Sequence, residues 1–93
     1  MTNTRPFTIV QGDPDNDVEW SYRTGMKVRS LIGCTFEACE EVIGLIEYET
    51  GEFEVGIGEC LRPYDELYFG KDLEKASRIW FEAILERAYE EGA

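Results

Sequence analysis

Two segments, 42–49 and 52–59, flank the dipeptide Thr50-Gly51, and next to it apolar residues and glutamates alternate in both (residues 46–49 and 52–55). This alternation indicates two strands with one apolar face each, and the turn signal between them predicts an antiparallel hairpin. A two-residue loop would oppose like charges, since it pairs Glu49 with Glu52 and Glu47 with Glu54. The same register places six apolar residues from the two strands on one face: Val42, Ile46, Tyr48, Phe53, Val55 and Ile57. No other segment constrains the fold as strongly.

Shorter strand patterns precede this hairpin. Residues 7–11 form a short apolar run, residues 18–23 alternate around Trp20 and Tyr22, and residues 26–32 predict a third strand. Residues 33–41 are compatible with one or two helical turns or with a long bent strand. After the hairpin, Arg62-Pro63 is expected to end the strand, and residues 64–70 to form a connection with one turn of helix.

The last segment predicts a helix that begins after Asp72, a suitable N-cap, and stops before Gly92. Three- and four-residue spacing defines one wide apolar stripe: Leu73, Ala76, Trp80, Phe81, Ile84, Leu85 and Ala88. We expect Trp80 and Phe81 in the core, the alternative being exposed aromatics in a binding surface. On the outer side, Glu74 and Arg78 form an i,i+4 pair. A row of mutually repelling glutamates follows: Glu82, Glu86 and Glu90.

Strand patterns come first and the long helix last, which favours an α+β fold. The prediction is an antiparallel sheet of four to five strands, connected as a meander of hairpins and packed by one long C-terminal helix. With 93 residues and no linker or repeat, we expect one domain over residues 1–93.

The chain has 20 acidic and 9 basic side chains, a net charge of −11. A charge of this size repels nucleic acid and anionic membranes and attracts basic proteins. Direct binding of nucleic acid is therefore not expected, nor is binding to a membrane. A halophilic origin, in which acidity is general, is an alternative explanation of the charge.

The acidic residues are unevenly distributed. From Ser30 to Leu61 the chain has no Lys or Arg, and the same stretch contains eight glutamates. Opposed like charges on a sheet are destabilising. One explanation is a hairpin tip at which water and salt screen the repulsion. The other is a surface suited to a basic groove, where carboxylates roughly 6.6 Å apart along a strand would imitate successive phosphates.

The residues that usually carry catalysis or bind metals are sparse. Histidine is absent, so Ser21, Ser30 and Ser77 have no imidazole to activate them, and no phosphate-binding glycine motif is present. The spacing of Asp13, Asp15 and Asp17 resembles the start of a calcium loop, but the required glycine and the final glutamate are missing. We therefore expect no enzyme activity, no cofactor and no metal.

The three cysteines, Cys34, Cys39 and Cys60, are an odd number for a disulfide framework and are expected to be free thiols. The amino terminus lacks the pattern of a signal peptide, and no apolar run is long enough to span a bilayer. These observations predict a cytoplasmic location.

Small size, acidity and the absence of motifs are similar to the profile of phage-borne inhibitors such as anti-restriction and anti-CRISPR proteins. That similarity is one of class and implies a non-catalytic inhibitor that blocks the nucleic-acid groove of a nuclease. The expected partner-binding residues are Glu47, Glu49, Glu52 and Glu54, with Glu82, Glu86 and Glu90 as a second patch. The alternatives are an immunity protein or antitoxin for a basic toxin, and a structural subunit that forms a homodimer.

Overall fold

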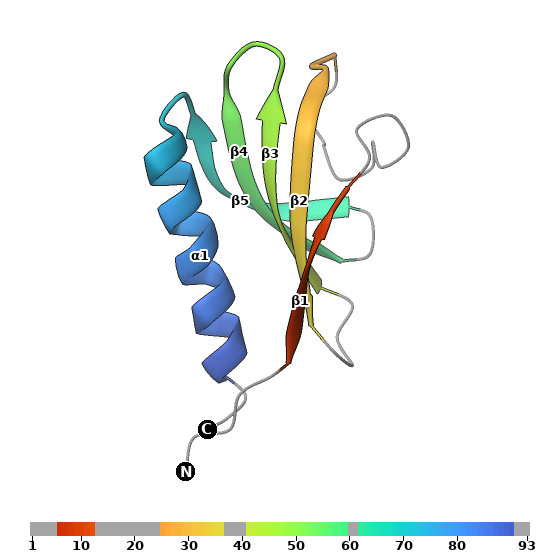
Figure 1. Cartoon of the computed structure of the whole chain (residues 1–93), viewed down its shortest axis with the longest axis vertical. Coiled ribbons are helices and arrows are strands. Elements are labelled where there is room, and N and C mark those ends of the chain that lie inside the picture. Colours follow the sequence, from red (N-terminus) through yellow and green to blue (C-terminus); the bar gives the residue numbers. More distant parts are fainter. Residues whose placement is uncertain (1–5, 13–24, 37–40, 60–61, 91–93) are drawn as a thin grey trace.

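The computed structural model describes residues 6–12, 25–36, 41–59 and 62–90. In chain order the elements are β1 (Phe7–Gln11), β2 (Val28–Phe36), β3 (Glu41–Tyr48), β4 (Phe53–Glu59), β5 (Arg62–Gly70) and α1 (Leu73–Glu90). The strands form one antiparallel sheet in the order β1-β2-β3-β4-β5, and α1 packs on one of its faces (Figure 1). The predicted α+β fold is confirmed.

The predicted hairpin exists, but its predicted register is wrong by one residue. Ile46 faces Glu54 and Glu47 faces Phe53. The loop has three residues, because the amide of Tyr48 donates to the carbonyl of Glu52 (2.9 Å) and that of Gly51 to Tyr48 (3.0 Å). Gly51 has a positive φ of 91°, as expected for the last residue of a three-residue hairpin loop. The one-residue shift places Glu54 on the face that carries Ile46 and Tyr48, and it moves Phe53, Val55 and Ile57 to the opposite face, so the predicted single apolar face is wrong.

Two other segments differ from expectation. Residues 33–36 continue β2, so the ambiguous stretch begins as strand. Residues 62–70 form β5 instead of a loop with a helical turn, and Pro63 does not end the sheet. Pro63 is tolerated because β5 is an edge strand, with irregular pairing to β4 near this residue. The strand expected at 18–23 and the acidic turn at 13–17 lie outside the described residues.

Helix α1 begins where the sequence predicts. Asp72 is its N-cap, since the amide of Lys75 donates to Asp72 Oδ1 at 3.1 Å. The Glu74–Arg78 pair is also present, with the charged atoms 3.5 Å apart. The helix is tied to the sheet by Trp80, whose indole Nε1 donates to the carbonyl of Ile43 in β3 at 2.8 Å.

The two faces of the sheet carry separate apolar clusters. On the helix side, β2, β3 and β4 pack against α1 through Cys34, Phe36, Ile43, Ile57, Ala83, Ile84 and Ala88. On the opposite side, the buried cluster consists of Leu31, Ile46 and Tyr48, with Met26, Val28 and Phe69 packed against it. The helix contacts chiefly β3, β4 and β5. It therefore covers one half of its face of the sheet and leaves the half formed by β1 and β2 less protected.

Candidate functional site

The first predicted patch, the hairpin glutamates, does not form one acidic row. Glu47 lies 3.4 Å from the Arg29 guanidinium and accepts a hydrogen bond from Ser30 Oγ at 3.2 Å. Glu49 lies 4.0 Å from Lys27 Nζ. Both cations are on or just before β2, the strand that pairs with β3. The negative charge of residues 30–61, a stretch without Lys or Arg, is therefore partly balanced by cations at the start of β2.

The remaining two hairpin glutamates differ from each other. Glu52 accepts a hydrogen bond from Thr50 Oγ1 at 2.9 Å, within the turn. Glu54 is fully buried, with 0% of its surface exposed. Its Oε1 accepts a hydrogen bond from the hydroxyl of Tyr48, on the face opposite α1. In this structure Glu54 is therefore part of the interior, whereas Glu47 and Glu52 are half-buried and Glu49 is exposed.

The second predicted patch, the helix glutamates, has fewer compensating charges. Glu82 and Glu86 are exposed on the side of α1 that points away from the sheet. Within the described part of the chain, no cation lies within salt-bridge distance of either carboxylate, whereas Arg78 pairs with Glu74 and Arg87 with Glu41. Glu90 is the last residue of the helix, and its side chain is outside the described set.

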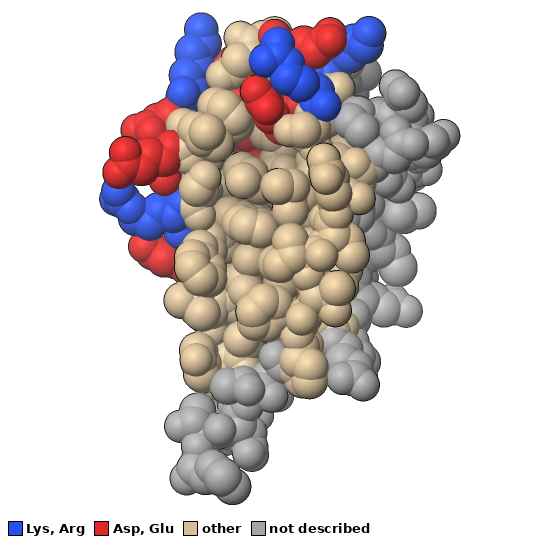
Figure 2. Space-filling view, viewed as in Figure 1, with Lys and Arg blue, Asp and Glu red and all other residues tan. Residues whose placement is uncertain are grey.

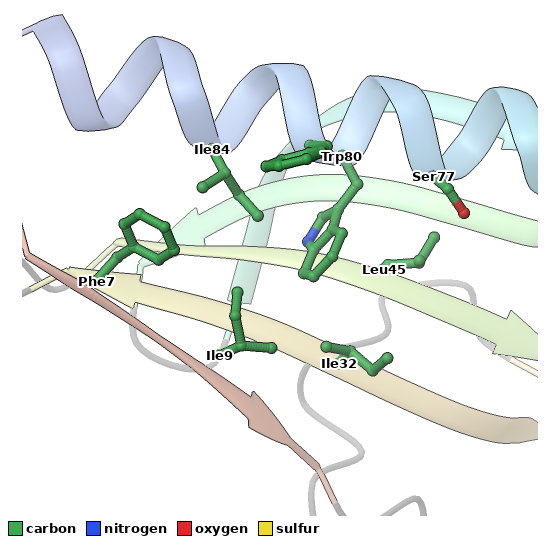
Figure 3. Close-up of a pocket in the computed structure, with 8 residues that line it drawn as sticks. Phe7, Ile9, Ile32, Leu45, Ser77, Trp80 and Ile84 are labelled. Atoms are coloured by element: carbon green, nitrogen blue, oxygen red, sulfur yellow. The ribbon is translucent and has the colours of Figure 1, made fainter.

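A groove of about 640 Å³ lies between α1 and the open half of the sheet. Figure 3 shows its construction: Phe7 and Ile9 point in from β1, Ile32 and Leu45 form the floor on β2 and β3, and Trp80 and Ile84 form the helix wall. Phe81 and Ser77 complete the lining. Both sides of the groove are therefore apolar, with a serine hydroxyl at its edge.

Exposed apolar side chains extend this groove along the helix. Phe81, Leu85 and Tyr89 are 55%, 40% and 52% exposed, and on the opposite wall Phe7 and Ile9 are 43% and 48% exposed. The expectation that Phe81 belongs to the core is wrong, and Leu85 and Leu73 of the predicted stripe are also exposed. Phe81, Leu85 and Tyr89 follow at four-residue steps, so they lie on one side of the helix. We refer to these three residues as the apolar strip.

Charge is absent from most of this face. Figure 2, which has the same orientation as Figure 1, shows Lys, Arg, Asp and Glu at the upper end and along the outer side of the helix, and uncharged residues over the described surface between α1 and β1. An apolar surface of this kind, bordered by charge, is typical of an interaction site. In a chain of net charge −11 the separation is pronounced.

Metal-ligating side chains do not cluster among the described residues. No group of three or more His, Cys, Asp or Glu is placed to hold a metal ion in this part of the chain. Cys34 is a free thiol in the core, and burial raises its pKa from 9.0 to about 11. A thiol with a pKa this high is almost entirely protonated near neutral pH and is a poor nucleophile.

Among the described residues, no helix has both the length and the apolar character needed to cross a bilayer.

Comparisons with protein-family models, with curated proteins and with solved structures give no significant match to this chain. The candidate site therefore rests on its own geometry. It consists of the groove between α1 and β1, the apolar strip, and the glutamates beside that strip.

The sequence shows part of this site. The helix glutamates are visible in the spacing of residues 82–90, and the alternative of exposed aromatics applies to Phe81. The contribution of Phe7 and Ile9 has no signal in the sequence, because it depends on β1 lying at the far edge of the sheet from β5. One clue is the width of the helix stripe, which carries more large apolar side chains than one half-sheet can cover.

Proposed function

We propose that this protein is a non-catalytic binding protein whose partner is a basic protein surface. The observation that carries the proposal is the exposed pair Glu82 and Glu86 on α1, neither of which forms a salt bridge with a described residue, in a chain of net charge −11. Like charges four residues apart destabilise a helix slightly, by about 0.2–0.5 kcal/mol per pair. A basic partner would turn this repulsion into attraction.

Among basic surfaces, the nucleic-acid groove of a nuclease is the first candidate, as for phage-type inhibitors of the anti-CRISPR or anti-restriction kind. Size and acidity support this choice. A regular row of hairpin carboxylates does not, because Glu54 is buried and Glu47 and Glu49 are offset by Arg29 and Lys27. We therefore base the proposal on complementary charge and not on imitation of a phosphate backbone.

The second candidate is an immunity protein or antitoxin that neutralises a basic toxin. The apolar groove favours it, since a partner that binds partly through apolar contact keeps more of its affinity when salt screens the charges. The two candidates differ in whether nucleic acid competes with the protein for the partner.

A pull-down from lysate at low and at high salt, followed by binding assays with the purified partner, tests the proposal. Reversal of charge in Glu82→Lys/Glu86→Lys should weaken binding by about tenfold or more, and Glu82→Gln/Glu86→Gln by less. Glu49→Lys/Glu52→Lys measures the share of the hairpin turn. A partner that is acidic, or binding that is unchanged by both reversals, would contradict the proposal. Competition by a DNA or RNA duplex would favour a nuclease-type partner, and its absence an immunity protein or antitoxin.

A further inference from the structure

The open half of the sheet has the dimensions of a missing helix. Five strands span four gaps of about 4.8 Å, or roughly 19 Å, whereas a helix with its side chains is about 10 Å wide. Helix α1 contacts chiefly β3, β4 and β5. The space beside it, between α1 and β1, is the groove, which runs along α1 (Figure 3). An element of about the width of α1 would complete the layer.

The chemistry of the groove requires an apolar side on that element. Phe7 and Ile9 from β1 and Phe81 from α1 are about half exposed at its mouth, and Ile32 and Leu45 on its floor are half-buried. An amphipathic helix that lays its apolar side in such a groove is a common mode of recognition. The apolar side chains of that helix would remove these surfaces from water.

The charge on the outer side of α1 indicates what the other side of the occupant should carry. Each residue of the apolar strip is followed directly by a glutamate: Phe81 by Glu82, Leu85 by Glu86, and Tyr89 by Glu90. One residue is a rotation of about 100° around a helix, so the glutamates lie next to the strip on the side of α1 that points away from the sheet, outside the groove. Arg78, four residues before Glu82, lies in the same row and is paired with Glu74. A helix that packs in the groove and over the strip would bring the long basic side chains of its outer flank within reach of Glu82 and Glu86.

We propose that the groove between α1 and β1 binds a basic amphipathic helix of the partner protein, with the apolar side of that helix against Phe7, Ile9 and Phe81 and its basic flank along Glu82 and Glu86. The inference rests on the proposed function, because it specifies which part of a basic partner is bound and where. The groove supplies the apolar contact and the glutamates select the sign of the charge.

Three designed peptides as long as α1 provide the probes. A Leu/Lys peptide has an apolar side and a basic side, a Leu/Glu peptide keeps the apolar side and reverses the charge, and a Ser/Lys peptide keeps the charge without the apolar side. Affinities measured by fluorescence polarisation with the full chain should be highest for Leu/Lys. We expect Ser/Lys and Leu/Glu each to bind at least about tenfold more weakly.

Substitutions on the two walls locate the binding. Phe81→Ser/Leu85→Ser on the helix and Ile9→Ser on β1 should each weaken the Leu/Lys peptide by about tenfold or more. The matched control is Leu73→Ser, which removes an equally exposed apolar side chain from the same helix outside the groove. It should change the affinity less than twofold. Because the substituted residues are exposed, the variants should keep the far-ultraviolet circular dichroism of the parent chain.

The outcomes separate this inference from the proposed function. If Leu/Lys and Ser/Lys bind equally and neither responds to the wall substitutions, binding by charge stands and the groove proposal is wrong. If Leu/Glu binds as tightly as Leu/Lys, the groove takes an apolar helix without regard to charge, and the proposal of a basic helix is overturned. If no peptide binds, the groove proposal is again wrong, while the lysate experiment still tests the proposed function. Sedimentation of the chain alone supplies the last outcome, because a dimer that Phe81→Ser/Leu85→Ser dissociates would make a second copy the occupant.

Discussion

The sheet face that carries α1 has a covered half and an open half, and both are built from large apolar side chains. In the covered half, Ile43 and Ile57 pack against Ile84 and are almost completely buried. In the open half, nearly half of the surface of Phe7 and of Ile9 is exposed to solvent. Both halves carry large apolar side chains. They differ because the helix lies over one half and leaves the other open (Figure 1).

This difference shows that a single helix divides its own apolar stripe between two tasks. Ala83, Ile84 and Ala88 contribute to folding because they are buried against the sheet. The apolar strip of Phe81, Leu85 and Tyr89, on the adjacent side, contributes little to folding because water still reaches it. Surfaces that stabilise the protein and surfaces available to a partner therefore lie within one turn of each other.

The largest expected effect comes from removing one side chain from each half and comparing the two losses of stability. Ile84→Ala leaves a cavity in the covered half and should lower the free energy of unfolding by about 2–5 kcal/mol. Phe81→Ala removes a larger side chain but an exposed one, and should cost less than about 1 kcal/mol. Urea denaturation of both variants measures the difference. Equal losses would show that Phe81 is packed and that the open half is closed in solution.

The second prediction uses the thiol of the covered half. Burial raises the pKa of Cys34 from 9.0 to about 11, so the folded protein holds this proton more tightly than the unfolded chain does. The resulting stability is fully present below pH 9 and is lost as pH rises from 9 to 11, by on the order of 2 kcal/mol. Urea denaturation of the parent chain and of Cys34→Ala should be measured at pH 8.5 and at pH 11. Between these pH values the free energy of unfolding of the parent should fall by this amount more than that of the variant. A difference that stays constant with pH would contradict the burial of this thiol.

The third prediction concerns the start of α1, the helix that supplies both the buried residues and the apolar strip. Asp72→Ala removes the acceptor for the Lys75 amide and should lower stability by about 1 kcal/mol. Asp72→Asn keeps a capping oxygen and should cost only a few tenths of that. The thermal midpoints of the two variants give the comparison. If Asp72→Ala lowers the free energy of unfolding by more than Ile84→Ala does, the helix depends more on its cap than on its packing.

The smallest expected effect lies on the exposed side of the helix. The pair of Glu74 and Arg78 is solvent-exposed, and Glu74→Gln should change stability by less than about 0.5 kcal/mol. The change should shrink further at 1 M salt. Arg78→Gln is the matched variant, because it breaks the same pair from the other side. A loss above 1 kcal/mol in either variant would mean that this side of the helix is packed more tightly than the structure shows.

The sequence predicts the parts of this fold that local rules determine. The hairpin, the helix with its Asp72 cap and the Glu74–Arg78 pair all follow from residue spacing, and the structure confirms them. The register of the hairpin failed because a two-residue and a three-residue loop share the same Thr50-Gly51 signal. Only the backbone conformation of Gly51 and its neighbours decides between them.

The candidate site was harder to predict because it depends on contacts between distant segments. Lys27 and Arg29 approach Glu49 and Glu47 only because β2 lies beside β3. The exposure of Phe81 depends on how many strands one helix can cover, which periodicity does not specify. β5 was missed since Pro63 interrupts the pattern that sequence rules require of a strand, whereas an edge strand tolerates it.

The walls of the groove come from the first strand and the last helix of the described chain. Phe7 and Ile9 are contributed by β1, and Trp80, Phe81 and Ile84 by α1 (Figure 3). Because β1 is synthesised well before α1, the groove forms only after α1 has been made and has packed on the sheet. A chain that lacks either element lacks one wall. The surface that we assign to the partner therefore exists only when two segments far apart in the sequence are folded onto the same sheet.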